Sequence, residues 1–218
     1  MFREVSVTWN PITGCLYYCS YCYARKLVET RLIYTTKKYR RGFRPAFHPN
    51  ELRRRFKPKQ FVFVCDMGDM FGWWVSPDEI RAVINHVAAY PYTTFLFLTK
   101  NPARYHEFRF PSNAILGATI ETDIDEIATR YSKAPPPSKR YEAMKTLEHP
   151  RKAVAVEPVM TFSERLFDWI VEIDPEIVWI GYDNHNNNLP EPPVKKVLEL
   201  AEKLLDVGIT VSLKTIPE

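Results

Sequence analysis

Apolar and polar residues alternate in blocks along the chain. Short apolar runs, rich in β-branched and aromatic residues and each followed by polar residues, occur at 4–9, 61–65, 94–99, 114–120, 152–157, 176–181 and 209–213. Near-continuous apolar runs of this length are typical of strands in a parallel sheet that is buried on both faces. The pattern therefore predicts about six to seven parallel strands.

Helical patterns lie between several of these runs. Residues 76–90 begin with Ser76 as a helix N-cap, Pro77 at the first helical position and Glu79 completing a capping box. Apolar stripes of helical period cover 163–173 and 192–208, and the second stripe ends at Gly208, a natural C-cap. Alternating strands and helices predict one α/β domain over residues 1–218, either an open doubly wound sheet or a full or partial barrel.

Charge is distributed unevenly along the chain. The net charge is +4, but residues 25–59 carry 13 Lys or Arg against 2 acidic residues. Such a block, interleaved with aromatic residues such as Tyr34, could contact the phosphates of DNA or RNA and stack on bases. An equally good interpretation is a solvated face whose cations pair with acids elsewhere.

The sequence carries no membrane or secretion signal. No apolar run reaches the roughly 18 to 20 residues that a membrane span needs, and the first ten residues are too polar for a signal peptide. We therefore expect a cytoplasmic protein with no membrane partner. In a reducing compartment, clustered cysteines indicate metal binding or redox chemistry before disulfides.

Polar residues follow every predicted strand. In parallel α/β proteins the loops after the strands open onto one face, where function gathers. The expected polar mouth comprises Asn10, Cys65 to Asp69, Thr99 to Asn101, Thr119, Glu121, Glu157, Tyr182 to His185 and Lys214.

Three of the four cysteines, Cys15, Cys19 and Cys22, have the spacing C-x3-C-x2-C. A structural zinc site needs four ligands, usually as two paired groups, and here only the remote Cys65 or His48 could complete one. Three thiolates close in sequence instead favour a [4Fe–4S] cluster with one iron open to a small molecule.

This motif, with Tyr21 before its last cysteine, resembles the signature of the radical S-adenosylmethionine (SAM) superfamily. The stretches TWNPITGC (8–15) and CYA (22–24) are similar to those of an often phage-encoded radical-SAM-like family. Later blocks that match this family lie at 61–72, 94–105, 115–122, 153–160 and 212–214. A more distant similarity is to spore photoproduct lyase, a DNA-repair radical SAM enzyme.

The resemblance implies a single-domain partial (β/α) barrel and a radical SAM enzyme. Cys15, Cys19 and Cys22 would hold three irons of the cluster, and SAM would chelate the fourth. The reduced cluster would cleave SAM to a 5′-deoxyadenosyl radical that abstracts hydrogen from a substrate. The electron would come from a flavodoxin- or ferredoxin-like donor protein.

The resemblance also implies roles for single residues. Tyr21 would lie beside the adenine. Many members carry Gly-Gly-Glu for the methionine amino group where this chain has Asp66-Met67-Gly68-Asp69, so Asp66, Gly68 and Asp69 are candidates for that contact. Thr119 and Glu121 would contact the ribose or carboxylate, and Glu157 is a further cofactor-binding candidate.

Cys65 has two interpretations, a small buried apolar residue or a hydrogen-atom donor to a product radical. Lys100 and Lys214 either bind an anionic ligand or pair with Glu121 and Asp183. His185 is either a titrating group or a solvated loop residue. Trp73 and Trp74 are either core residues or an exposed stacking platform.

The leading hypothesis is a radical SAM enzyme that acts on a nucleic acid or nucleotide. One alternative keeps the radical chemistry and takes a peptide or small metabolite as substrate. Another is a non-catalytic nucleic-acid-binding protein whose cysteines hold a structural metal.

Overall fold

Seven parallel strands form one curved sheet in the computed structural model, which describes residues 2–217. The strand order is β1-β4-β5-β6-β7-β8-β9, and every neighbouring pair is parallel. The bounds are Val7–Trp9, Phe61–Val64, Thr94–Thr99, Ala114–Thr119, Lys152–Val156, Ile177–Gly181 and Thr210–Lys214. All seven predicted runs are therefore strands, and the sheet is a half-barrel, the partial barrel that was predicted.

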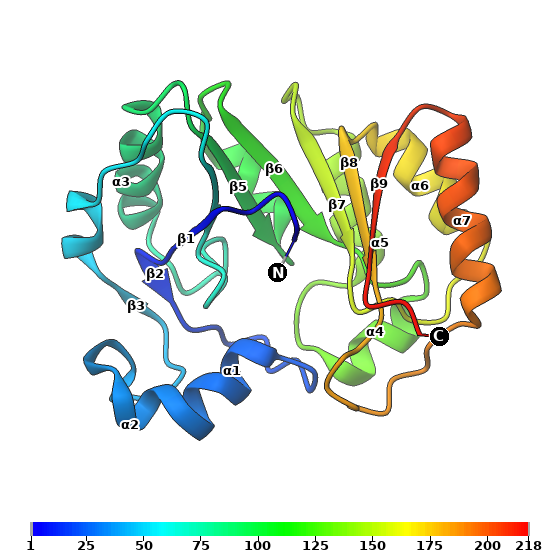
Figure 1. Ribbon diagram of the computed structural model, residues 1–218, viewed down its shortest axis with the longest axis horizontal. Helices are drawn as coiled ribbons and strands as arrows, with labels where there is room; N and C mark the ends of the chain where they lie inside the picture. The colour runs from blue at the N-terminus through cyan, green and yellow to red at the C-terminus, as the bar shows by residue number, and fades with distance from the viewer. Residues whose placement is uncertain (1, 218) are drawn as a thin grey trace.

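Helices cover the outer face of this sheet (Figure 1). They are α3 (Pro77–Ala88), α4 (Asp125–Tyr131), α5 (Pro137–Lys145), α6 (Arg165–Ile173) and α7 (Val194–Asp206). A 3₁₀ helix spans Pro102–Glu107 between β5 and β6. The capping box of Ser76 and Glu79 is present at the start of α3, as predicted. The pattern over 114–157 did not predict α4 and α5, which are short and polar.

The strands separate two apolar cores because successive side chains point to opposite faces. In β4, Val62 and Val64 pack toward the helices, whereas Phe61 and Phe63 face the concave interior. Phe2, which precedes β1, packs into this interior and stacks on Trp179 with ring centroids 4.2 Å apart. Burial on both faces explains why the strand sequences are continuously apolar.

A long segment, residues 10–60, separates β1 from its sheet partner β4. It contains β2 (Ile12–Thr13), α1 (Tyr23–Leu27), a π-helical turn (Val28–Leu32), α2 (Ile33–Thr35), a 3₁₀ turn (Lys37–Tyr39), β3 (Ala46–Phe47) and a 3₁₀ helix (Pro49–Arg53). β2 and β3 pair antiparallel, so the two ends of the chain segment between them lie side by side. Figure 1 shows α1 and α2 below the sheet, at the end where the strands finish.

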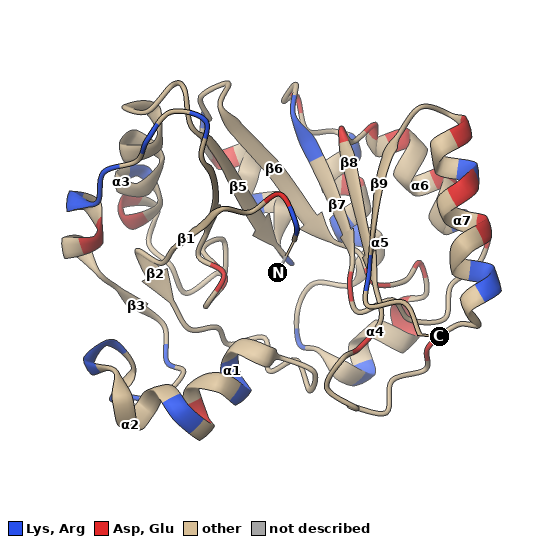
Figure 2. Cartoon of the chain, in the orientation of Figure 1, with Lys and Arg blue, Asp and Glu red and all other residues tan. Residues whose placement is uncertain are grey.

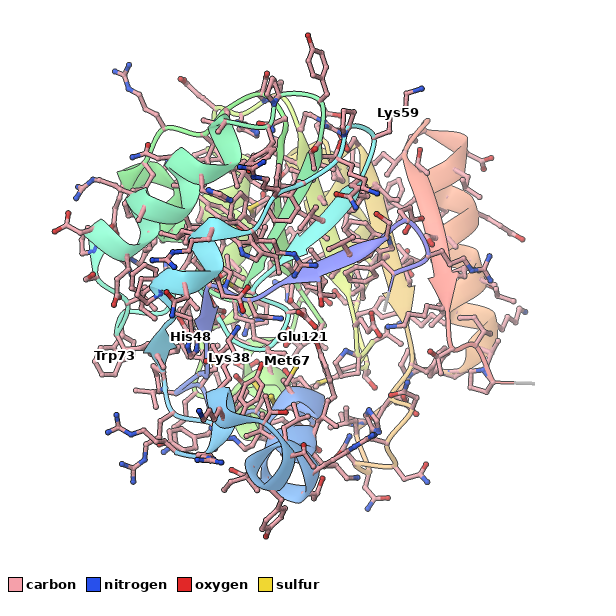
Figure 3. All side chains as sticks on the ribbon, turned by 60° about the vertical axis from the view of Figure 1, so that its left-hand side comes forward. Lys38, His48, Lys59, Met67, Trp73 and Glu121 are labelled. Atoms are coloured by element: carbon pink, nitrogen blue, oxygen red, sulfur yellow. The ribbon has the colours of Figure 1, made fainter. Side chains whose placement is uncertain are left out.

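The basic block does not form one face. Residues 25–44 follow the cysteine loop at the carboxyl ends of the strands, whereas Lys57 and Lys59 precede β4 and lie at the opposite end of the sheet. Figure 2 shows separate groups of basic positions on the α1–α2 segment and before β4, and Figure 3 places Lys59 far from Lys38 and Met67. A single contiguous surface over 25–59 is therefore excluded.

Among the helices of residues 2–217, none is both long enough and apolar enough to cross a membrane.

Candidate functional site

A cavity of about 330 Å³ opens at the carboxyl ends of the strands. The cysteine loop and the loop after β4 line one side, and the ends of β7, β8 and β9 line the other. Aromatic and aliphatic side chains, among them Phe2, Phe63 and Leu98, line its interior. The predicted polar mouth thus encloses a cavity with an apolar lining.

All three clustered cysteines line this cavity. Gly14 and Gly68 form a parallel bridge that ties the start of the cysteine loop to the loop after β4. A Cβ on Gly68 would lie 2.8 Å from backbone atoms of Gly14, and one on Gly14 would lie 2.3 Å from the Arg44 carbonyl oxygen. The two glycines are thus required for the backbones to approach this closely.

Each of the three thiols has one hydrogen-bond partner. The Tyr17 N–H donates to Cys15 Sγ and the Arg25 N–H to Cys22 Sγ, both at 3.4 Å, and Cys22 is also the N-cap of α1. The Ser132 hydroxyl lies 3.1 Å from Cys19 Sγ. Donors directed at sulfur are the usual environment of cluster thiolates.

The loop also contains buried polar atoms without a partner. Within the described residues, Tyr17 Oη and Arg25 Nε are buried and make no hydrogen bond, and Tyr17 lines the cavity. Burial raises the pKa of the Cys15 and Cys22 thiols, and metal coordination would reverse this by deprotonating them. The Tyr17 and Arg25 donors without a partner fit an anionic group beside the three cysteines. Nowhere in residues 2–217 do three His, Cys, Asp or Glu side chains converge on a single-ion site.

The loop after β4 carries two aspartates with different surroundings. Asp69 is buried and accepts hydrogen bonds from the Phe71 and Lys100 N–H groups and the Thr99 hydroxyl at 2.7–3.0 Å. Asp66 has one protein partner for its side chain, Asn10 Nδ2 at 2.6 Å on Oδ1. Both line the cavity, but only Asp66 keeps a carboxylate oxygen without a protein donor.

Glu121 lies behind the cavity wall rather than in it. Its side chain is fully buried, with Tyr21 Oη and Arg140 Nη1 each at 2.5 Å and an ion pair to Lys100. Although burial opposes ionisation, Arg140 and Lys100 lower the pKa of Glu121 to about 2. Glu121 does not line the cavity, and its carboxylate holds Tyr21, Lys100 and Arg140, so its expected ribose or carboxylate contact stays a prediction.

Thr119 and Glu157 do line the cavity, as does Tyr21. Lys100 pairs with Glu121, as predicted, but Lys214 pairs with Glu157 at 2.5 Å rather than with Asp183. The Lys214 side chain points inward from β9 and meets Glu157 at the end of β7 because the two strands flank β8.

Cys65 follows β4 with a left-handed backbone (φ 60°), and its thiol is buried but borders the cavity. Burial raises the pKa of this thiol, so it keeps its proton at neutral pH. Both interpretations of Cys65, a core residue and a hydrogen donor, are compatible with this position.

The remaining candidates divide between the cavity and the surface. His185 is exposed and lines the cavity through the loop after β8. Trp73 is 73% exposed, whereas Trp74 packs edge-on against Tyr17 with centroids 4.8 Å apart. Trp73 is thus a surface residue, whereas Trp74 packs against the core.

Sequence reasoning missed Ser132 and Arg140. Both come from the segment between β6 and β7, 113 and 19 residues from the side chains they contact. A buried arginine is normally paired with an acid. A buried role for Arg140 was therefore only weakly indicated, by its place in a short helix preceded by prolines. Nothing in the sequence indicated a role for Ser132.

The family of this chain is shown by comparing its sequence with family models. A family model described as a protein of unknown function, DUF5131, matches residues 3–201. The chain belongs to the DUF5131 family. Among curated proteins, none is similar enough to this DUF5131 member to count as a match.

Solved structures with a fold similar to that of this DUF5131 chain include radical SAM enzymes. A double mutant of spore photoproduct lyase with bound AdoMet and dinucleoside spore photoproduct has a TM-score of 0.64 at 11% identity, covering 100% of this chain and 79% of that one. A radical SAM methyltransferase from Sphaerobacter thermophilus has a TM-score of 0.56 at 12% identity (99% and 67% covered). SuiB from Streptococcus suis, bound to precursor peptide SuiA, has a TM-score of 0.56 at 9% identity (98% and 50% covered). The predicted radical SAM fold is confirmed.

Proposed function

We propose that this DUF5131 protein is a radical SAM enzyme, with Cys15, Cys19 and Cys22 as ligands of a [4Fe–4S] cluster. One observation carries the proposal: three hydrogen-bonded thiols line a cavity at the strand ends of a radical SAM barrel. When bound together, such a cluster and SAM supply a 5′-deoxyadenosyl radical. The cavity's apolar interior supports this use, because it excludes water and other hydrogen donors from a reactive radical.

The chain's own residues would bind and orient SAM. Asp66, with a free carboxylate oxygen, is the better of the two aspartates for the methionine amino group. Gly68 contributes by letting its backbone approach Gly14. Thr119 and Glu157 are placed to contact the ribose or carboxylate, and Tyr21, fixed by Glu121, to lie beside the adenine.

Cys65 is proposed as the hydrogen-atom donor to a product radical. In this step its S–H bond breaks, a C–H bond of the product forms, and a thiyl radical remains on Cys65. Its position at the cavity and its protonated state support the role.

The deciding experiment is anaerobic reconstitution with iron and sulfide, reduction, and addition of SAM. We expect 5′-deoxyadenosine from the native protein and none from a Cys15, Cys19, Cys22 triple-alanine variant. Zinc bound in place of iron, with no SAM cleavage, would overturn the proposal and favour a structural metal.

The substrate is proposed to be a nucleic acid or nucleotide, bound through the basic segment between the cysteine loop and β3, residues 25–44, which we call the arm. Within the described residues, six exposed cations here form no ion pair: Lys26, Arg31, Lys37, Arg40, Arg41 and Arg44. Tyr34 among them is 81% exposed, as a stacking residue must be. This surface borders the cavity because α1 begins directly after Cys22.

Binding of labelled single-stranded DNA and RNA, measured by anisotropy over a salt series, tests this assignment. Each phosphate contact should steepen the slope of log K against log salt by about 0.7. We expect R40E/R41E to weaken binding and flatten the slope. The charge-matched control R53E/R55E, on the second basic group, should leave both unchanged. Equal effects of the two variants would contradict the assignment to residues 25–44, and no binding of either nucleic acid would favour a peptide or small metabolite as substrate.

A flavodoxin- or ferredoxin-like protein is the proposed electron donor. Reduction of the cluster by such a protein, in place of a chemical reductant, is the measurement that tests it.

A further inference from the structure

Ser132 is held against the cysteine loop from the other half of the chain. It follows α4 as its C-cap in an extended conformation (φ −150°, ψ 144°) and is 6% exposed. Two backbone hydrogen bonds flank it: Ser20 N–H donates to the Tyr131 carbonyl (2.9 Å) and Lys133 N–H to the Tyr17 carbonyl (2.7 Å). The residues on both sides of Ser132 are thus each hydrogen-bonded to the backbone of the cysteine loop, which fixes the serine between them.

The direction of the contact to Cys19 follows from the other partner of the hydroxyl. The Ala134 N–H donates to Ser132 Oγ at 3.1 Å, so that oxygen already serves as an acceptor. Its own proton is free to point toward Cys19 Sγ, 3.1 Å away. With a thiolate at Cys19 the hydroxyl can only be the donor, because a thiolate has no proton to give.

This donor differs in kind from those of the other two thiols. Cys15 and Cys22 receive backbone N–H groups from within three residues, and these donors persist whatever the side chains are. Cys19 receives a side-chain hydroxyl from 113 residues away. The Cys19 donor is therefore one that a single substitution can delete without altering the loop backbone.

We propose that Ser132 is a positioning residue that fixes Cys19 and raises the reduction potential of the cluster bound there. The inference rests on the proposed function, since it requires a cluster on the three cysteines. One-electron reduction adds negative charge to the cluster and its thiolates. A hydroxyl aimed at a sulfur stabilises the reduced form more than the oxidised form.

The test is a redox titration of reconstituted protein, poised with dithionite and followed by the EPR signal of the reduced cluster. In Ser132→Ala we expect the ratio of reduced to oxidised cluster at a fixed solution potential to fall by about threefold to tenfold, tenfold being 59 mV for a one-electron couple. Ser132→Thr keeps the hydroxyl and suits the extended backbone, so it should restore the native potential. The matched control is Ser138→Ala, whose hydroxyl bonds Asp125 Oδ2 at 2.6 Å and should change nothing.

Every outcome has a defined reading. Native potentials in Ser132→Ala, or a Ser132→Thr variant that behaves like alanine, overturn the inference while leaving the proposed function intact. Loss of the cluster in Ser132→Ala alone, with Ser132→Thr and Ser138→Ala loaded, supports the positioning of Cys19 by the hydroxyl. A native protein that takes up no cluster overturns the proposed function and this inference with it.

Discussion

Replacing Arg140 by methionine should strongly destabilise the fold, because it leaves Glu121 ionised, buried and short of a partner. Arg140 is 1% exposed and spans three acceptors: the Pro135 and Thr119 carbonyls and the Glu121 carboxylate. In Arg140→Met the Oε2 atom of Glu121 loses its donor, while Lys100 and Tyr21 still bind Oε1. Loss of one member of a buried ion pair costs about 3–5 kcal/mol.

The pKa of Glu121 gives an independent magnitude. Lowering it from its ordinary 4.5 to about 2 corresponds to roughly 3 kcal/mol of folding free energy at neutral pH. This contribution is fully present above pH 4.5 and is lost as pH falls from 4.5 toward 2. The pKa should move back toward its ordinary value in Arg140→Met, so the variant should lose less stability over that pH range than the native protein does.

Urea unfolding followed by far-UV circular dichroism, in metal-free reducing buffer at pH 7 and at steps down to pH 3, measures both effects. Arg151→Met is the control, because Arg151 pairs with Glu176 at the surface, where both side chains are about one-third exposed. The control should stay within about 1 kcal/mol of the native protein. The reasoning is refuted if Arg140→Met costs no more than this control.

Four further substitutions test the cavity. Gly68→Ala should cost about 1–3 kcal/mol in urea unfolding and reduce iron uptake, because its Cβ would lie 2.8 Å from Gly14 backbone atoms; native uptake would show that the bridge is dispensable. Asp66→Asn should weaken SAM binding to loaded protein about tenfold to a hundredfold by equilibrium dialysis, since it removes a charged acceptor, whereas Asp69→Asn should mainly lower stability; the reverse pattern would exchange the two roles. Cys65→Ala should retain 5′-deoxyadenosine formation but alter substrate turnover or the identity of the product. If 5′-deoxyadenosine formation, turnover and product identity all stay unchanged, Cys65 is a core residue.

The strands could be predicted from the sequence because each is buried on both faces and therefore continuously apolar. The helix α3 was equally accessible, since its capping box is a local signal that needs no tertiary contact. The three cysteines were predicted to act together from spacing alone, and the structure places them around one cavity.

What the sequence could not provide depends on contacts between distant segments. Glu121 follows a strand like the other cavity residues, but its partner Arg140 lies in a separate helix and draws it behind the wall. Ser132 carries no pattern at all until the two backbone hydrogen bonds beside it are known. The basic block looks continuous in the sequence, but within it the chain passes from the carboxyl ends of the strands to the opposite end of the sheet, which only the topology reveals.

The pairing of β2 with β3 makes the arm an exchangeable part of the molecule. Ile12 and Thr13 lie opposite Phe47 and Ala46, so the chain leaves the barrel after the cysteine loop and returns to it at β3, with the arm between. Because these ends are already joined, the entropy of closing the loop depends weakly on its length, with a doubling costing only about 0.6 kcal/mol. Relatives could therefore lengthen, shorten or recharge the stretch beyond Cys22 while the barrel and its cysteines remain in place. Specificity can diverge on the exposed side of the arm at little entropic cost, while Ala24, Val28, Tyr39 and Phe43 keep their packing against Met67.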